Sequence, residues 1–149
     1  MKKTFFCALL LCSCLPQAFA GDTKFTTRIA GVEHSLSLRP GQPGKEGVPS
    51  YDYVYEQRAG RCHFRLAGHA VGLAEEIDGK MALIQYNGQD SKGRETPPVV
   101  AFDSDDLTLS LPAKGGLRQA GIRAPLEPAQ RARACAKVDD EGLTVMFRK

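Results

Sequence analysis

The chain after residue 20 alternates apolar and polar residues along most of its length, a pattern typical of half-buried β-strands. The alternation predicts two strands, over residues 24–30 and 33–39, joined by a tight turn around Gly31-Val32. One face of the second strand collects the side chains of His34, Leu36 and Leu38. An antiparallel hairpin with one apolar face is therefore expected at the start of the folded chain.

Three tyrosines mark the next predicted strand. Tyr51, Tyr53 and Tyr55 alternate with an aspartate and a valine, so their side chains share one face of the strand. Tyrosine is enriched at protein interfaces, and an exposed stripe of this kind would be a binding surface. The alternative is that the stripe forms one side of the core, with its hydroxyl groups reaching solvent. The pattern leaves both positions open.

The segment over residues 61–86 carries the clearest strand and turn signals. Its first half alternates regularly until Gly68 and Gly72 interrupt the pattern. Glycines inside a strand usually mark a bulge or a bend, which curls small sheets into barrels. Asp78-Gly79 is the signal of a two-residue type I′ hairpin turn, and the return strand is expected over residues 80–86.

Two polar stretches, residues 40–50 and 87–98, are predicted to be long loops. The first contains three prolines and three glycines. Hairpin connections usually have about two to five residues, so loops of this length are either flexible or functional. In the second loop, the residues available for directed contacts are Lys92, Arg94 and Glu95. We therefore treat these three side chains as candidate binding residues.

The C-terminal part combines strands with a helix. Strands are expected over residues 99–102, 107–111 and 143–147. Pro128 suits the first turn of a helix, and residues 129–138 are rich in good helix formers. Small residues at helical spacing would place one helix face against the sheet: Ala132, Cys135 and Ala136.

These elements together predict the fold class. We expect a mainly β protein with an antiparallel sheet of about eight strands, curled into a barrel or sandwich, and one short C-terminal helix. The length of 149 residues suits one folded domain, which we place at residues 21–149.

Residues 1–20 have the three parts of a secretory signal peptide. Two lysines precede an apolar run over residues 5–15, which is too short to span a bilayer as a helix. Ala18-Phe19-Ala20 then supplies a small-x-small cleavage pattern. The sequence therefore predicts cleavage near Ala20, a periplasmic or secreted location, and no membrane span in the mature chain.

A second processing route remains open. Leu11-Cys12-Ser13-Cys14 resembles a bacterial lipobox, in which Cys14 would be lipidated and become the new N-terminus. Two observations count against this route. Cleavage before Cys14 would shorten the apolar run, and the later Ala-Phe-Ala pattern would have no purpose.

Removal of the leader changes the charge and the cysteine content. The full chain has 20 Lys and Arg against 17 Asp and Glu, and loss of Lys2 and Lys3 leaves a formal net charge of +1. A nearly neutral chain gives no support to a nucleic-acid partner. Three of the five cysteines leave with the leader, and the remaining two, Cys62 and Cys135, are expected to pair as a disulfide in an oxidising compartment.

No group of residues makes a recognisable catalytic or metal centre. The chain lacks a G-x-S-x-G nucleophile elbow, and a disulfide would remove both thiols as nucleophiles. His63 and His69 have the same strand parity but would lie roughly 20 Å apart on a straight strand, too far to share one ion. A bend at Gly68, or help from His34, would be needed for a metal site. The sequence predicts no enzyme, no cofactor and no metal, with an unrecognised site that uses one of these histidines as the alternative.

The remaining class is a binding protein of the cell envelope that acts by surface complementarity. Its expected partner is another envelope protein or a secreted hydrolase, which would make the chain an inhibitor or immunity-type protein. Periplasmic lysozyme inhibitors have this general build, but their S-G-x-x-Y loop motif is absent from this sequence. The alternative is a carrier that holds a small apolar ligand inside a β-barrel.

Overall fold

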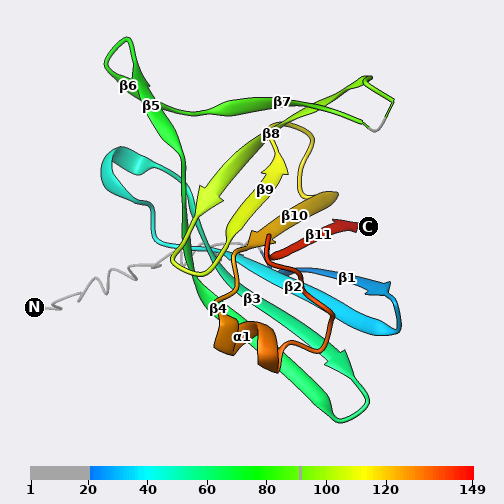
Figure 1. Cartoon of the computed structure of the whole chain (residues 1–149). Coiled ribbons are helices and arrows are strands. Elements are labelled where there is room, and N and C mark those ends of the chain that lie inside the picture. The colour runs from blue at the N-terminus through cyan, green and yellow to red at the C-terminus, as the bar shows by residue number, and fades with distance from the viewer. Residues whose placement is uncertain (1–20, 91) are drawn as a thin grey trace, which may run out of the picture.

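Eight antiparallel strands form a sheet that is nearly closed into a barrel (Figure 1). The computed structural model describes residues 21–90 and 92–149. The predicted leader, with its cleavage and lipidation sites, lies outside the described residues. The mainly β, antiparallel fold with one short helix confirms the fold class expected from the alternation of apolar and polar residues.

The barrel strands follow one another around the sheet in their order along the chain. They are β1 (Thr23–Ile29), β2 (Val32–Pro40), β3 (Ser50–Ala59), β4 (Cys62–Gly72), β8 (Glu95–Asp103), β9 (Thr108–Pro112), β10 (Gln119–Ala124) and β11 (Leu143–Arg148). The first and last of them, β1 and β11, contact each other, but among the described residues they share no ladder of backbone hydrogen bonds. This seam is where the barrel remains open.

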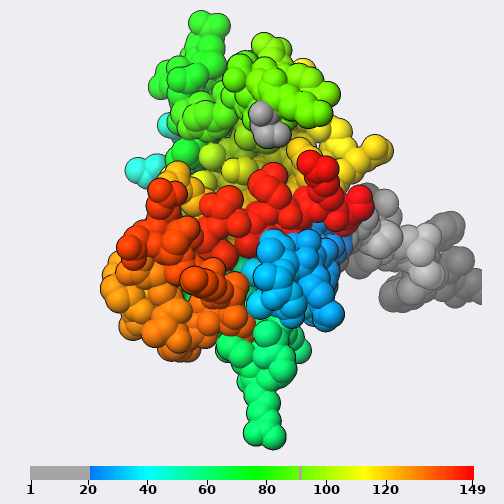
Figure 2. Space-filling model, turned by 45° about the vertical axis from the view of Figure 1, so that its right-hand side comes forward, coloured from blue at the N-terminus to red at the C-terminus, as the bar shows by residue number. Residues whose placement is uncertain are grey.

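Three more strands are inserted between β4 and β8. They are β5 (Ala74–Ile77), β6 (Lys80–Leu83) and β7 (Gln85–Gln89). β5 and β6 form a separate two-stranded sheet, whereas β7 pairs with β8. We call residues 74–89 the arm, since Figures 1 and 2 show its β5–β6 hairpin, in green, standing out from the body of the molecule.

Side chains from the barrel strands point inward and fill the barrel. β11 shows the pattern most simply, because Leu143, Val145 and Phe147 are buried and the residues between them are exposed. The largest side chains that are less than 2% exposed include Phe25, Leu36, Leu38, Tyr55, Leu109, Ile122 and Phe147. The predicted inward face of β2, with His34, Leu36 and Leu38, is confirmed.

Two tight turns follow from residues that accept positive φ angles. Asp78 and Gly79 have φ of 52° and 73°, as a type I′ turn requires, so the predicted hairpin is confirmed. The first hairpin turns at Ala30 and Gly31, with φ of 48° and 81°, one residue earlier than the sequence predicts. Pairing of Ile29 with Val32 fixes this register.

Gly68 does not mark a bulge, because β3 and β4 pair without interruption from Ser50 opposite Val71 to Ala59 opposite Cys62. The glycine makes room for an aromatic ring instead. A Cβ atom at Gly68 would lie 2.8 Å from the hydroxyl oxygen of Tyr53, which is its cross-strand partner. The expectation of a bulge here is therefore wrong, and the glycine leaves room for the Tyr53 side chain.

Two further expectations require correction. Residues 87–98 are not a long loop, because β7 extends to Gln89 and β8 begins at Glu95. A strand at β10 is not expected from the sequence, because its only large apolar side chain is that of Ile122; pairing with β9 and β11 holds it in the sheet. The stretch between β2 and β3 is irregular as expected, apart from a short 3-10 turn at Lys45–Gly47.

The helix is shorter than predicted. α1 spans Pro128–Arg133 and ends because Ala134 takes an extended backbone conformation. Ala132 is exposed and does not lie against the sheet, while Cys135 and Ala136 are half-buried in the segment that follows. No helix within residues 21–90 and 92–149 is both long and apolar enough to span a membrane.

Candidate functional site

Within the described chain, the β5–β6 hairpin of the arm pairs with no strand of the barrel, whereas β7 pairs with β8. β4 pairs with β8 only at Val71 and Gly72, and the chain leaves the barrel directly after this point. β5 and β6 pair with each other and with no other strand of the described chain. An isolated two-stranded ribbon is at best marginally stable in water, so this hairpin depends on its base for support.

The base of the arm is fixed to the barrel by backbone hydrogen bonds and one apolar side chain. The Leu73 amide donates to the Ala101 carbonyl at 2.9 Å, and the Ile84 amide donates to the Leu73 carbonyl at 2.8 Å. Leu83 packs against the buried core. The hairpin therefore projects from a rigid base, an arrangement typical of recognition loops on stable scaffolds.

The arm carries two large apolar side chains that are exposed. Among the described residues, four large apolar side chains are exposed, namely Ile29, Ile77, Tyr86 and Met146. Two of these belong to the arm: Ile77 is 51% exposed beside the β5–β6 turn, and Tyr86 is 44% exposed on β7. The arm also carries three carboxylates, on Glu75, Glu76 and Asp78, against the single ammonium group of Lys80. Its surface is thus apolar and mildly acidic.

Two of the binding residues predicted for residues 87–98, Lys92 and Arg94, lie in the turn between β7 and β8, and the third, Glu95, begins β8. The Asp90 carboxylate accepts hydrogen bonds from the amides of Lys92 and Arg94, at 2.8 and 3.0 Å, and pairs with the Arg94 side chain at 2.7 Å. These bonds from Arg94 lower the pKa of Asp90. Lys92 and Arg94 are exposed in this turn, and Glu95 is exposed at the start of β8.

The structure places the tyrosine stripe inside the barrel, one of the two positions that the sequence leaves open. Tyr53 and Tyr55 are 2% and 0% exposed. Tyr51 is half-buried, and its ring packs edge-on against Phe102 with 5.1 Å between the ring centres. Burial raises the pKa of all three phenols. Their side chains therefore belong mainly to the core and not to an exposed patch.

Cys62 and Cys135 form the predicted disulfide, with their Cα atoms 5.6 Å apart. The bond ties the segment after α1 to the start of β4. This pairing fits an oxidising compartment outside the cytoplasm.

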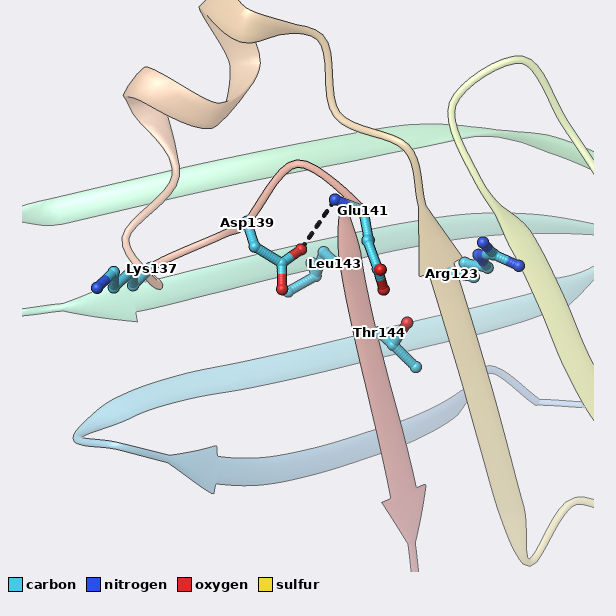
Figure 3. A pocket seen from close by; sticks show the side chains of 7 residues that line it. Arg123, Lys137, Asp139, Glu141, Leu143 and Thr144 are labelled. Atoms are coloured by element: carbon cyan, nitrogen blue, oxygen red, sulfur yellow. Dashed lines mark hydrogen bonds between the residues drawn. The ribbon is translucent and has the colours of Figure 1, made fainter.

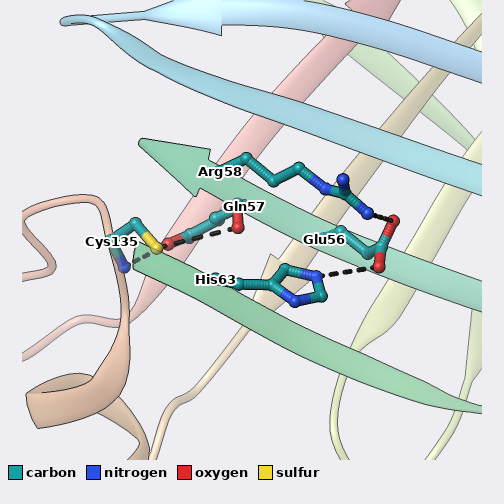
Figure 4. Close-up of polar contacts among 5 residues, drawn as sticks. All are labelled: Glu56, Gln57, Arg58, His63 and Cys135. Carbon is teal, nitrogen blue, oxygen red and sulfur yellow. Dashed lines mark hydrogen bonds and ion pairs between the residues drawn. The ribbon is translucent and has the colours of Figure 1, made fainter. Parts of the chain in front are cut away.

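A buried glutamine, Gln57, lies next to Cys135, one of the two cysteines of this disulfide (Figure 4). Its side chain is 0% exposed, and its carbonyl oxygen accepts hydrogen bonds from the backbone amides of Cys135 and Ala136, at 2.8 and 3.0 Å. Its amide nitrogen donates to the Tyr55 hydroxyl at 3.0 Å, and that hydroxyl lies 2.7 Å from His34 Nδ1. Sequence reasoning missed Gln57, although it has the same strand parity as the tyrosine stripe.

His34 gives this buried network a dependence on pH. Burial lowers the pKa of His34 from its ordinary value of 6.5. As the pH falls through about 6.5, the unfolded chain therefore binds a proton that the folded chain does not, and the free energy of unfolding falls. We expect urea unfolding to show a steeper loss of stability between about pH 7 and pH 5 for wild type than for His34→Leu.

The control for this pH prediction is Leu36→Val, a core substitution on the same strand. It lowers stability without removing a titratable group, so it should retain the wild-type slope. Identical slopes for wild type and His34→Leu would show that His34 is not protonated differently in the two states.

The other two histidines lie on the outer face of the sheet, each paired with one carboxylate. His63 Nε2 is 2.9 Å from a carboxylate oxygen of Glu56, which lowers the pKa of that carboxyl (Figure 4). His69 Nδ1 is 2.8 Å from a carboxylate oxygen of Asp52. Within the described ranges, no three His, Cys, Asp or Glu side chains are grouped to hold a metal ion.

A charged cavity of about 550 Å³ lies beside the start of β11 (Figure 3). Its side chains include two cations, Arg123 and Lys137, and two anions, Asp139 and Glu141. The Glu141 backbone amide donates to the Asp139 carboxylate at 3.0 Å, which shapes the turn that enters β11. Because the charges are balanced and face open solvent, the cavity selects neither an anion nor a cation.

Comparison with known proteins identifies no relative. No protein-family model, no curated protein and no solved structure matches this chain. The molecule is therefore defined by its own geometry: a nearly closed antiparallel barrel, stapled by one disulfide, from which an arm with exposed apolar residues projects.

Proposed function

We propose that this chain is an exported binding protein of the cell envelope that recognises another protein through the arm. The observation that carries the proposal is the β5–β6 ribbon, which pairs with no other strand of the described chain and presents Ile77 beside its turn. A partner that covers this ribbon would bury its apolar surface and its unpaired strand edges. Recognition by adding strands or covering a hairpin is a common mode of protein association.

The composition of the arm indicates the chemistry of the partner surface. Ile77 and Tyr86 supply apolar anchors, and Tyr is among the residues enriched at interface centres. The three carboxylates around Ile77 favour a partner whose apolar site has basic groups at its rim. A narrow ribbon of this kind fits a groove, which is the reason to favour a secreted hydrolase as partner and an inhibitor or immunity-type role for this chain.

The proposed location is the periplasm or the cell exterior after cleavage near Ala20. The disulfide supports an oxidising compartment, and lipidation at Cys14 is the competing route. The intact mass of the exported protein separates the two, because a lipidated product would begin at Cys14 and carry acyl chains.

Substitution in the arm tests the proposed function. Immobilised exported protein is exposed to envelope extract and to secreted hydrolases, and captured proteins are identified by mass. We expect Ile77→Ser to weaken capture of one stoichiometric partner by about tenfold or more, as a central apolar anchor does. The effect on folding should be small, because half of this side chain is already exposed.

The matched control is Ile29→Ser, since Ile29 is 46% exposed on the β1–β2 hairpin, outside the arm. It should capture the partner as wild type does. Equal loss with both variants, or a partner lost only with Ile29→Ser, would move the recognition surface away from the arm. Absence of any specific partner would contradict the proposed function.

A further inference from the structure

A second, mostly apolar cavity of about 310 Å³ lies at the open seam of the barrel, outside the arm. It is bounded by the β1–β2 hairpin, by the start of β11 and by the segment that follows Cys135. Figure 2 shows this side of the molecule, with the hairpin in blue next to the orange segment and the red strand. The principal lining residues are Ile29, Val32, His34, Ala136, Leu143 and Val145.

His34 is the buried polar residue among these lining residues, and its hydrogen bonds assign its protonation. Gln57 must turn its oxygen toward the two backbone amides of residues 135 and 136, because amides only donate. Its NH₂ group therefore donates to the Tyr55 hydroxyl oxygen, and the hydroxyl donates its single proton to His34 Nδ1. Nδ1 is thus the acceptor, and the proton of the neutral ring is on Nε2.

This assignment leaves a buried donor without an acceptor. His34 is 2% exposed, and its Nε2 has no hydrogen-bond partner among residues 21–90 and 92–149. Buried donors that lack an acceptor are rare in native proteins, and each one calls for an explanation. Because Nδ1 is held by Tyr55, the ring cannot turn to pair Nε2 without breaking that bond.

We propose that this cavity, which His34 lines, binds a small, uncharged, mostly apolar molecule whose carbonyl oxygen moves in to accept the hydrogen bond of His34 Nε2, an atom that solvent does not reach in the free protein. A carbonyl matches a site with a single donor, since it accepts and does not donate. The apolar lining fits a hydrocarbon body, and the volume lies at the lower end of the range on the order of 300–1,000 Å³ found for ligand sites. A charged ligand group is not favoured inside the cavity, because the His34 ring is neutral and the positively charged Lys137 lies at the exposed rim.

Heptan-2-one is a suitable probe, with hexane as the probe of similar apolar surface that lacks the acceptor. Titration of the exported protein is followed by NMR, through the backbone amides of Ala136 and Val145 and the Nε2–H resonance of His34. We expect saturable shifts at these positions with the ketone and binding about tenfold weaker with hexane. The Nε2–H resonance should also report the tautomer directly in the free protein.

Two substitutions separate the donor from the space around it. His34→Leu removes the donor. Ala136→Leu fills the cavity but keeps the backbone amide of residue 136, which donates a hydrogen bond to Gln57. Each should weaken ketone binding about tenfold or more, whereas Ala132→Leu on the exposed face of α1 should not. Ala136→Leu also keeps the test valid if His34→Leu fails to fold.

Several results would overturn the proposal. One is ketone binding of equal strength in wild type and in Ala136→Leu. Another is the absence of saturable shifts at the cavity, or a water molecule at Nε2 that the ketone does not displace. A proton found on Nδ1 in the free protein would also overturn it.

Discussion

Replacement of both Cys62 and Cys135 by serine is expected to lower the free energy of unfolding by about 4 kcal/mol. The disulfide closes a loop with a sequence separation of 73 residues, and the entropy of the unfolded chain that it removes grows with loop length. A domain of this size is typically stable by about 5–15 kcal/mol, so the variant would be marginal at 37 °C. Guanidinium unfolding of the oxidised wild type and the double variant measures the difference.

The control for the disulfide prediction changes one exposed residue near each cysteine. Arg61 and Arg133 are both exposed, and their replacement by serine leaves the bond intact. That control should differ from wild type by no more than about 0.5 kcal/mol per site. Two free thiols in denatured, unreduced wild type, or a double variant as stable as wild type, would contradict the prediction.

Replacement of Gln57 by leucine is the second change with a large expected effect. It removes the acceptor of two backbone amides, those of Cys135 and Ala136, and the donor to the Tyr55 hydroxyl. A buried group left without its partner costs about 1–3 kcal/mol. Because the segment at residues 135 and 136 is half-buried, we expect a total loss of about 2–4 kcal/mol in urea unfolding.

Gln85→Leu makes the same chemical change at an exposed position of β7. Its effect on the free energy of unfolding should be within about 0.5 kcal/mol. If Gln57→Leu unfolds at the same urea concentration as Gln85→Leu, the Gln57 network does not hold the segment after α1 in place.

The sequence predicts those parts of the fold that local chemistry determines. Asp78-Gly79 accepts the positive φ angles of its turn, and alternation places the inward face of β2 correctly. β10 escapes detection because its strand conformation comes from pairing on both sides and not from its own apolar content. β7 and the first half of β8 are not predicted for a related reason: an exposed hairpin needs no apolar face, so its residues show no alternation of apolar and polar positions.

The helix error has a different origin. Residues 129–138 are rich in good helix formers, but the amides of Cys135 and Ala136 donate to Gln57, a residue 78 and 79 positions away, in place of carbonyls one turn back. A tertiary contact of this kind cannot be read from propensity. Propensity and the small-residue spacing therefore place Ala132 on the sheet, whereas the structure leaves it exposed.

The candidate sites were only partly accessible from the sequence. The arm could be located by its turn signal, but the exposure of Ile77 and Tyr86 depends on where the hairpin leaves the barrel. The Gln57–Tyr55–His34 network requires the register of β2 against β3, which brings His34 opposite Gln57. Polar residues at inward positions of a strand, such as His34 and Gln57, are the sequence signal that could have indicated it.

Amide hydrogen exchange of this chain, alone and in complex with the captured partner, tests the central claim most directly. That claim is that the arm is the recognition surface. We expect the amides of the β5–β6 hairpin, residues 74–83, to exchange rapidly in the free protein, because this ribbon pairs with no barrel strand of the described chain, and to become strongly protected in the complex, with little change elsewhere on the barrel. Protection confined to another face, with the arm still exchanging as in the free protein, would contradict it.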